Sequence, residues 1–199
     1  MRIVQFARAP VPGAVKTRLI PALGADAACT LHCRLVEHTT QRLLAAETAA
    51  LELYTDDTNN DWLQRHAQRY ALPLCLQRGD DLGARMFAAC ADQPAKPTII
   101  VGSDCPALDA DYLGSAIDAL RSANVVIGPA CDGGYVLIGT QTPQPGLFKG
   151  IDWGSDKVLA QTLACAAASG LPVVQLAELR DIDRPEDLAS LPDYGIATD

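Results

Sequence analysis

The sequence predicts a layered α/β fold built on a mixed, mainly parallel sheet. Along most of the 199 residues, short apolar runs of strand type alternate with longer segments of helical periodicity, the pattern expected for parallel strands joined by helices. Late in the chain, Asp132-Gly133-Gly134 is a strong turn signal that predicts a hairpin and therefore an antiparallel strand. No repeat, low-complexity tract or Gly/Ser-rich linker divides the sequence, so we expect a single domain over residues 1–199.

The individual elements follow from local pattern. Strands are expected where apolar or β-branched runs are bounded by turn residues, and these runs cover 2–7, 51–55, 73–77, 98–101, 125–129, 136–139 and 172–176. Helices are expected where apolar residues recur every three or four positions. They cover 26 to about 46, about 62–70, a segment that begins after the carboxylates at 80 and 81, a segment capped by Asp109, about 157–168, and a segment opened by Pro185.

Composition and charge exclude several classes of function. The net charge is −8 at pH 7, which argues against a general affinity for nucleic acid or anionic membranes. No apolar run approaches the length of a membrane span, and the first residues resemble a strand and not a signal sequence, so we expect a cytoplasmic protein without a membrane span. The seven cysteines lack metal-site or redox spacing, and we expect reduced thiols.

The strand at 98–101 places a carboxylate at the centre of the predicted sheet. Its four residues lie between Pro97 and Gly102, which is typical of a buried strand. Because ligands of open α/β sheets gather at the carboxyl ends of the strands, Asp104 is a candidate ligand-binding residue. The alternative is that Asp104 is an ordinary turn residue.

The loop after the first strand carries two cations. Pro12 and Gly13 shape this loop, and Lys16 and Arg18 supply donors that suit phosphate oxygens. A position directly after the first strand of an α/β domain favours contact with a ligand. The alternative is an exposed basic turn.

Three further segments carry candidate ligand contacts. Around Asp80, two glycines allow close approach of a ligand, although Asp80 or Asp81 could equally cap a helix while Arg85 forms a surface ion pair. Asp132 and Tyr135 are expected near the same sheet edge as Asp104. Trp153 could stack on a sugar or base, or it could fill the core.

Six segments, in order along nearly the whole chain, carry a family resemblance. They are 6–13 (Phe-Ala-Arg-Ala-Pro with Pro-Gly), 16–19 (Lys-Thr-Arg-Leu), 81–86 (Asp-Leu-Gly-Ala-Arg-Met), 102–106 (Gly-Ser-Asp-Cys-Pro), 128–135 (Gly-Pro-Ala with Asp-Gly-Gly-Tyr) and 181–188 (Asp-Ile-Asp-Arg-Pro-Glu-Asp-Leu). In these segments the chain resembles DUF2064, a bacterial family of uncharacterised proteins that includes the arsenosugar-biosynthesis type of glycosyltransferase. The resemblance implies a nucleotide-diphospho-sugar transferase fold of the GT-A type, a Rossmann-like arrangement of three α/β/α layers.

The resemblance also implies roles for particular residues. Mg²⁺ or Mn²⁺ would be held by Asp104 and Asp183, since hard cations prefer oxygen ligands, and Lys16 and Arg18 would act in catalysis on the phosphate groups. Asp132 is added as a candidate catalytic base by its position, because transfer to a hydroxyl benefits from a proton acceptor. The implied nucleotide-binding residues are Ala7, Pro12, Gly13, Lys16, Arg18, Asp80, Gly83, Arg85 and Ser103. By position alone, the candidate acceptor-side residues are Gly133, Gly134, Tyr135 and Trp153. The sequence departs from the common glycosyltransferase pattern, because Ser103-Asp104 stands where two aspartates separated by one residue are usual.

Three functions remain open at this point. The first expectation is a glycosyltransferase that moves a sugar from a nucleotide-diphospho-sugar to a small intracellular acceptor with the help of a metal ion. The second is a nucleotidyltransferase that joins a nucleoside triphosphate to a phosphorylated small molecule and releases pyrophosphate, because Lys16 and Arg18 look like the cations that such enzymes aim at a triphosphate. The third is a non-catalytic module that binds nucleotide-sugars.

Overall fold

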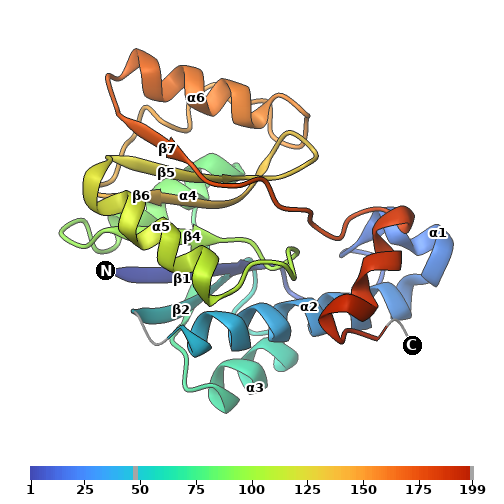
Figure 1. The fold of residues 1–199 in the computed structure, drawn as a ribbon. Coiled ribbons are helices and arrows are strands. Elements are labelled where there is room, and N and C mark those ends of the chain that lie inside the picture. Colours follow the sequence, from blue (N-terminus) through green and yellow to red (C-terminus); the bar gives the residue numbers. More distant parts are fainter. Residues whose placement is uncertain (47–48, 198–199) are drawn as a thin grey trace.

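The computed structural model describes residues 1–46 and 49–197. The seven strands of this part of the chain form one sheet in the order β3-β2-β1-β4-β6-β5-β7. Neighbouring strands are parallel except at β6, which is antiparallel to both β4 and β5 (Figure 1). The predicted fold class, with a mixed and mainly parallel sheet, is confirmed.

Element bounds agree closely with the sequence pattern. The strands are β1 (Arg2–Ala7), β2 (Ala50–Thr55), β3 (Leu74–Leu76), β4 (Thr98–Val101), β5 (Val125–Pro129), β6 (Tyr135–Thr140) and β7 (Val173–Gln175). The α-helices are α1 (Ile20–Leu23), α2 (Ala25–Ala45), α3 (Asp61–Arg69), α4 (Leu82–Ala91), α5 (Ala110–Ser122) and α6 (Val158–Ala168). The 3₁₀ helices are η1 (Thr17–Leu19) and η2 (Pro185–Tyr194).

The segment opened by Pro185 differs in type from a regular α-helix. It is the 3₁₀ helix η2, and it contains Pro192 in its interior. A proline inside an α-helix removes one backbone hydrogen bond and crowds the preceding turn, so this composition disfavours a continuous α-helix. The predicted entry is nevertheless correct, because Pro185 occupies the first turn.

Alternating residues along the strands divide the core into two faces. Ile3 packs in a cluster with residues of α5, whereas its neighbour Val4 packs in a cluster with residues of α4 and α6. Helices α2 and α3 cover the same face as α5, since Val36 and Leu63 join a cluster with Leu53 of β2 and Leu43 of α2 lies in the α5 cluster. The result is the expected three-layer arrangement, α/β/α (Figure 1).

Side-chain caps decide where two of the helices begin. The Asp109 carboxylate accepts a hydrogen bond from Tyr112 N at 2.9 Å, so α5 begins where the sequence predicts. At α4 the cap is Asp81 and not Asp80, because Asp81 Oδ1 accepts from Ala84 N at 2.7 Å. Asp80 is left exposed in the preceding loop.

A small helical lobe lies beyond the carboxyl ends of the parallel strands. It joins η1, α1, the first half of α2 and η2 around an apolar cluster of its own that includes Leu19, Leu31, Ile182 and Leu191 (Figure 1). The loop after β1 and the segment before η2 are thereby held together, although they lie at opposite ends of the sequence. This lobe forms one wall of the site described below.

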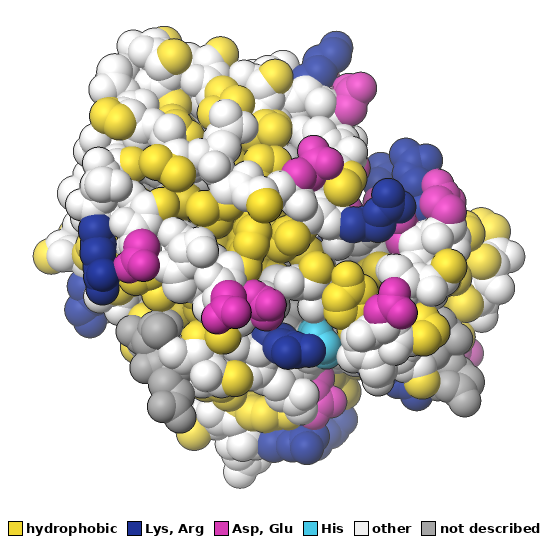
Figure 2. Space-filling model, viewed as in Figure 1, with side chains coloured by type: hydrophobic (Ala, Val, Ile, Leu, Met, Phe, Trp, Pro, Cys, Tyr) yellow, Lys and Arg dark blue, Asp and Glu magenta, His cyan; other side chains and the backbone are white. Residues whose placement is uncertain are grey.

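The surface carries charges of both signs. On the face drawn in Figure 2, acidic and basic side chains are interspersed, including where the sheet meets the α1–η2 lobe. Within residues 1–46 and 49–197, no helix is long and apolar enough to cross a membrane.

A buried ion pair fixes the start of β1 against β2 and α4. The Arg2 side chain is 1% exposed and contacts both oxygens of Glu52, with Nε···Oε1 at 3.0 Å and Nη2···Oε2 at 2.6 Å. Arg2 also donates to Tyr54 Oη at 2.9 Å and to the Ala89 carbonyl oxygen at 2.5 Å. Breaking such a pair from one side leaves an uncompensated buried charge.

We therefore expect Glu52→Ala to lower the free energy of unfolding by about 3–5 kcal/mol, measured by denaturant titration. The double variant Arg2→Met with Glu52→Leu removes both charges and keeps most of the volume. It should recover most of the lost stability. A double variant as unstable as Glu52→Ala would show that the loss comes from packing and not from the orphaned guanidinium.

Candidate functional site

Two adjoining cavities open at the carboxyl edge of the sheet. The first, about 310 Å³, contains Tyr135, Trp153 and Asp132 and is called the aromatic cavity. The second, about 400 Å³, is formed by the end of β1, the loop at 14–18 and Gln77, and is called the loop cavity. They share lining residues Arg18, Leu82, Gly102 and Asp104. A ligand could therefore extend from one cavity into the other past Asp104.

Asp104 and Lys16 form the contact at the junction of the cavities. The Lys16 ammonium lies 2.8 Å from Asp104 Oδ1, and it also donates a hydrogen bond to the Ile182 carbonyl oxygen. The Lys16 side chain is 3% exposed, whereas that of Asp104 is 47% exposed even though Oδ1 itself is buried. The Asp104 side chain therefore turns one oxygen toward Lys16 while the rest of it opens to the cavities.

The backbone at this junction is also held in place. Ile182 N donates to the Asp104 carbonyl oxygen at 2.8 Å, so Asp104 and Ile182 are joined through the main chain as well as through Lys16. Lys16 has a φ of 47°, in the left-handed region that is unfavourable for a residue with a side chain. Its two side-chain contacts compensate for this local strain.

The charge of Lys16 controls the protonation of Asp104. Burial by itself raises the pKa of this carboxyl, but the Lys16 ammonium, the charge that His32 carries at the acidic pH where Asp104 titrates, and the hydrogen bond from Lys16 together lower the pKa below its ordinary value. Asp104 is therefore ionised at neutral pH. An ionised carboxylate that faces a cavity is available to a cation.

His32 holds the loop after β1 through a hydrogen bond to its backbone. Burial lowers the pKa of His32, so the ring is neutral near pH 7. Its Nε2 lies 2.9 Å from the Arg8 carbonyl oxygen. Because a carbonyl only accepts, Nε2 carries the proton of the neutral ring. The ring therefore acts as a hydrogen-bond support for the loop.

Ser103 joins the ends of β1 and β4. Its hydroxyl donates to the Phe6 carbonyl oxygen at 2.8 Å and accepts from Gln5 Nε2 at 3.0 Å, and the side chain is buried. Ser103 lines the loop cavity, but its hydroxyl is already engaged within the protein. The serine in this position therefore has a structural reason, since a carboxylate here would be buried beside a carbonyl oxygen.

Arg18 and Asp183 form a second ion pair across the loop cavity. The Arg18 guanidinium contacts Asp183 Oδ2, and the Arg18 side chain is 55% exposed. The backbone of Asp183 is held by the buried Asp187, whose Oδ2 accepts from the amides of Asp183 at 3.1 Å and Arg184 at 2.8 Å. Asp183 is therefore fixed by the chain, while Arg18 keeps the freedom of a surface side chain.

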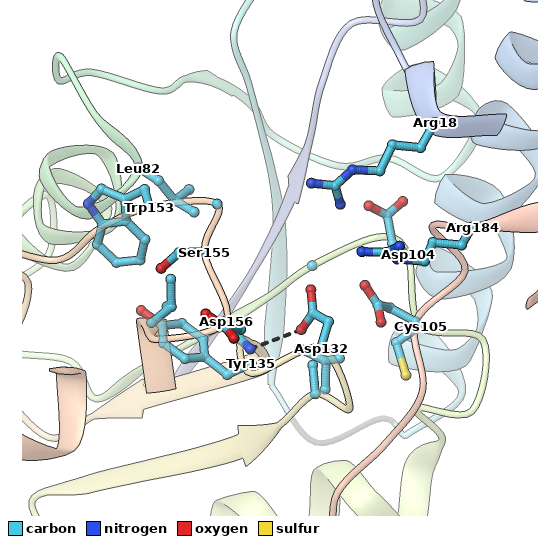
Figure 3. A pocket seen from close by; sticks show the side chains of 17 residues that line it. Arg18, Leu82, Asp104, Cys105, Asp132, Tyr135, Trp153, Ser155, Asp156 and Arg184 are labelled. Atoms are coloured by element: carbon cyan, nitrogen blue, oxygen red, sulfur yellow. Dashed lines mark hydrogen bonds between the residues drawn. The ribbon is translucent and has the colours of Figure 1, made fainter. Parts of the chain in front are cut away.

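The polar side of the aromatic cavity is rich in carboxylates. Asp132 is exposed and accepts a hydrogen bond from Gly134 N at 2.9 Å (Figure 3). Asp181 lines the same cavity, and its pKa is raised to about 6, first by burial and then by the charges of Asp132 and Asp104. These carboxylates are therefore close enough to repel one another, a condition that favours binding of a cation or a proton.

The opposite side of the aromatic cavity is apolar. Trp153 and Tyr135 meet edge to face with ring centroids 6.5 Å apart, and Leu82 lies beside them (Figure 3). Gly83 leaves room for the indole, since a Cβ at position 83 would stand 2.6 Å from Trp153 Cζ2. Trp153 thus packs on α4 and also lines the cavity. The packing agrees in part with the core alternative, and stacking on a sugar or base stays a prediction.

The structure places most of the sequence-predicted site residues around these cavities. Ala7, Lys16, Arg18, Arg85, Ser103, Asp104 and Asp183 line the loop cavity. Asp132, Gly134, Tyr135 and Trp153 line the aromatic cavity, together with Arg18 and Asp104. Pro12, Gly13, Asp80, Gly83 and Gly133 are not among the residues that line either one.

Several lining residues were not proposed as site residues from the sequence, and three of them stand out. Asp181 precedes Asp183 by two positions in an extended segment, and this alternation could have indicated it. Arg184 lines the aromatic cavity and forms no ion pair with any residue that the structure describes. Leu82, 43% exposed, lines both cavities, and no pattern in the sequence distinguishes it from an ordinary helix residue.

Gly133 packs closely against the segment that carries Trp153. It has a φ of +87°, and a Cβ there would stand 2.2 Å from the Asp156 carbonyl oxygen. Gly154 has a similar φ of +86° but nothing within 4 Å of a Cβ. The two glycines therefore share the same backbone strain on substitution, and only Gly133 adds a clash.

We expect Gly133→Ala to cost about 1–3 kcal/mol more stability than Gly154→Ala, because it alone forces Asp156 to move. Thermal unfolding measures this difference. Tryptophan fluorescence in a Trp62→Phe background should change in Gly133→Ala, since Trp153 moves with the displaced segment. Equal losses in both variants would mean that backbone strain alone matters at position 133.

Comparison with known proteins agrees with this description. Residues 39–155 match the model of a family described as "Uncharacterized protein conserved in bacteria (DUF2064)". A crystal structure from Desulfovibrio desulfuricans G20, named "putative nucleotide-diphospho-sugar transferase", is 32% identical, with a TM-score of 0.86 over 96% of this chain and 85% of that one. The comparison with curated proteins gave no match.

More distant structures share the fold. A nucleotidyl transferase from Methanothermobacter thermautotroptrophicus is 14% identical, with a TM-score of 0.63 over 99% of both chains. The inositol-1-phosphate CTP transferase from T. maritima is 14% identical, with a TM-score of 0.61 over 98% of this chain and 94% of that one. At these identities the likeness extends to the fold alone. The family match and the 32% identity over nearly the whole chain establish that this protein belongs to the DUF2064 family.

Proposed function

We propose that this protein is a glycosyltransferase that moves a sugar from a nucleotide-diphospho-sugar to a hydroxyl group of a small acceptor, with the help of a divalent cation. In this proposal the nucleotide and diphosphate occupy the loop cavity, the acceptor occupies the aromatic cavity, and the sugar lies between them beside Asp104. The name of the Desulfovibrio relative, a transferase of nucleotide-diphospho-sugars, supports the same class of donor.

The observation that carries this proposal is the charge of the aromatic cavity. Four of its lining residues are carboxylic acids, Asp104, Asp132, Asp156 and Asp181, whereas only Arg18 and Arg184 are cationic. A phosphate monoester is an anion at neutral pH and would be repelled by these carboxylates. It would also need no base to become a nucleophile. A neutral hydroxyl avoids the repulsion and gains from a nearby proton acceptor, so the cavity favours a hydroxyl acceptor.

Asp132 and Asp181 are the candidate bases. Asp132 is exposed at the cavity and oriented by Gly134 N. Asp181 has a pKa raised to about 6 by burial and by its acidic neighbours, and a base is most effective when its pKa lies near the working pH. One of them would remove the hydroxyl proton as the bond to the sugar forms.

On the donor side, the cations of the loop cavity suit a diphosphate. Lys16 and Arg18 stand at its junction with the aromatic cavity, and Arg85 lines it as well. These groups would orient the diphosphate and balance the negative charge that develops on it as the sugar leaves. The carboxamide of Gln77 donates to the Tyr54 carbonyl oxygen at 3.0 Å, and this hydrogen bond fixes the orientation of the Gln77 side chain. Gln77 lines the wall of the loop cavity, where the nucleobase of the donor could lie.

The residues fit a divalent cation only in part. Across residues 1–46 and 49–197, no group of three or more His, Cys, Asp or Glu side chains is arranged to hold a metal ion. Asp104 and Asp183 do line the same cavity, and two carboxylates with diphosphate oxygens form the oxygen-only environment that Mg²⁺ and Mn²⁺ prefer. We propose that these two residues hold the cation together with the donor. The ion would neutralise charge on the departing diphosphate.

Nucleotidyl transfer is the second candidate. The specific observation that favours it is the position of Lys16 and Arg18 in the loop directly after β1, where they could reach a triphosphate tail. The solved structures that share the fold of this protein include a synthetase complexed with CTP and the inositol-1-phosphate CTP transferase. The two functions differ in the product that is released, which is a nucleoside diphosphate for sugar transfer and pyrophosphate for nucleotidyl transfer.

Calorimetric titration with nucleoside diphosphates, triphosphates and diphospho-sugars, each with and without Mn²⁺, tests the proposal. We expect the tightest metal-dependent binding for one diphospho-sugar. Incubation of that donor with a small-molecule extract should then release the nucleoside diphosphate. Preference for a triphosphate, with release of pyrophosphate, would contradict sugar transfer.

The two candidate bases can be separated by substitution. Asp181→Asn and Asp132→Asn keep the size of each side chain but remove its basicity. The variant that removes the true base should lower turnover by about 10²–10⁴-fold while donor affinity measured by calorimetry stays the same. Normal turnover in both variants would contradict a base at either position.

A further inference from the structure

Both carboxylates of the proposed metal site are already paired with cations from one short stretch of chain. Lys16 contacts Asp104 at 2.8 Å, and Arg18 contacts Asp183. All four residues line the loop cavity. The two cations that would hold phosphate therefore occupy the two carboxylates that would hold the metal.

We propose that Lys16 and Arg18 are exchange partners: they neutralise Asp104 and Asp183 until a divalent cation binds, and they then transfer their contacts to the phosphate groups of the donor. This inference rests on the proposed function for the identity of the donor, but its test requires only the metal ion. It assigns Lys16 and Arg18 a second role, which is to compete with the metal.

Charge balance supports the exchange. Without ligand, two carboxylates face two cations, and the group is neutral overall. A divalent cation adds two positive charges, and a diphosphate restores the balance only if it is present as well. Metal alone must break two ion pairs without replacement, whereas metal with diphosphate gives every charge a partner. Binding of metal and of diphosphate should therefore reinforce each other, and the coupling must be reciprocal.

The two cations are built differently for this exchange. An ammonium group has three donors, so Lys16 can keep its hydrogen bond to the Ile182 carbonyl oxygen while one N–H turns from Asp104 to a phosphate. It therefore needs little movement. Arg18 is 55% exposed and is attached to the short helix η1, so its side chain is free to swing away from Asp183.

Arg184 provides a matched control for Arg18. Both arginines line the aromatic cavity beside Asp104 and both carry one positive charge. Arg184 follows Asp183 directly in the chain but forms no ion pair with any of the described residues, whereas Arg18 is paired with Asp183. Loss of either charge raises the general attraction for a cation. Only loss of Arg18 also frees a carboxylate.

The experiment is a titration of the full chain with Mn²⁺ alone, with free Mn²⁺ measured by electron paramagnetic resonance. We expect Arg18→Met to bind Mn²⁺ about fivefold more tightly than the unaltered protein, the size expected from removal of a competing exposed ion pair. Arg184→Met should raise the affinity less than Arg18→Met does, because it removes the same charge without freeing a carboxylate. Lys16→Met should act in the same direction as Arg18→Met, with its folding checked by circular dichroism because Lys16 is buried.

A double-variant cycle isolates the direct competition. In an Asp183→Asn background, Arg18→Met has no ion pair to break, so the fivefold gain should disappear. Equal effects of Arg18→Met and Arg184→Met, a gain that survives Asp183→Asn, or weaker Mn²⁺ binding by Arg18→Met would each overturn the exchange. Absence of Mn²⁺ binding in every variant would overturn it too.

These outcomes are distinguishable from failure of the proposed function. Release of nucleoside diphosphate from a diphospho-sugar, without tighter Mn²⁺ binding in Arg18→Met, would keep sugar transfer and reject the exchange. Tighter Mn²⁺ binding in Arg18→Met, without any sugar transfer, would keep the exchange and reject that reaction.

Discussion

The site depends on one buried ammonium group, that of Lys16. It joins three segments that are far apart in the sequence: its own loop after β1, Asp104 after β4, and Ile182 before η2. The Asp104 charge, the position of the Asp183 segment and the left-handed backbone of Lys16 all rely on these contacts. A lysine that is strongly hydrated when exposed is stable here only because both of its partners are present.

This arrangement explains how one edge of a sheet can hold two kinds of chemistry. The loop cavity pairs each carboxylate with a cation, while the aromatic cavity keeps an excess of carboxylates on one side and two rings on the other. Asp104 belongs to both cavities. If a metal ion replaced Lys16 as the partner of Asp104, the pKa of Asp181 would change as well, because the Asp104 charge contributes to that pKa.

The sequence predicts the sheet well because local patterns determine it. Local patterns and the family resemblance together also point to most of the candidate residues that line the two cavities, while the roles of these residues stay predictions. Apolar runs and turn residues locate the strands, and the carboxyl ends of β1 and β4 bring Lys16 and Asp104 to one edge. Contacts that depend on tertiary structure could not be read in this way. Lys16 meets the carbonyl oxygen of a residue 166 positions later, and the choice of Asp81 over Asp80 as helix cap rests on local geometry that both residues could have adopted.

Strand β6 gives the fold a place where it can change without a change in the loop cavity. Because β6 runs against β4 and β5, its first residue, Tyr135, lies at the ligand edge, and the turn from Ala130 to Gly134 closes directly over the aromatic cavity. The loop cavity is formed by other segments of the chain. Insertions or substitutions in this turn could therefore reshape the aromatic cavity among related proteins while the sheet and the loop cavity stay the same. Under the proposed function, selection of the acceptor could then evolve separately from selection of the donor.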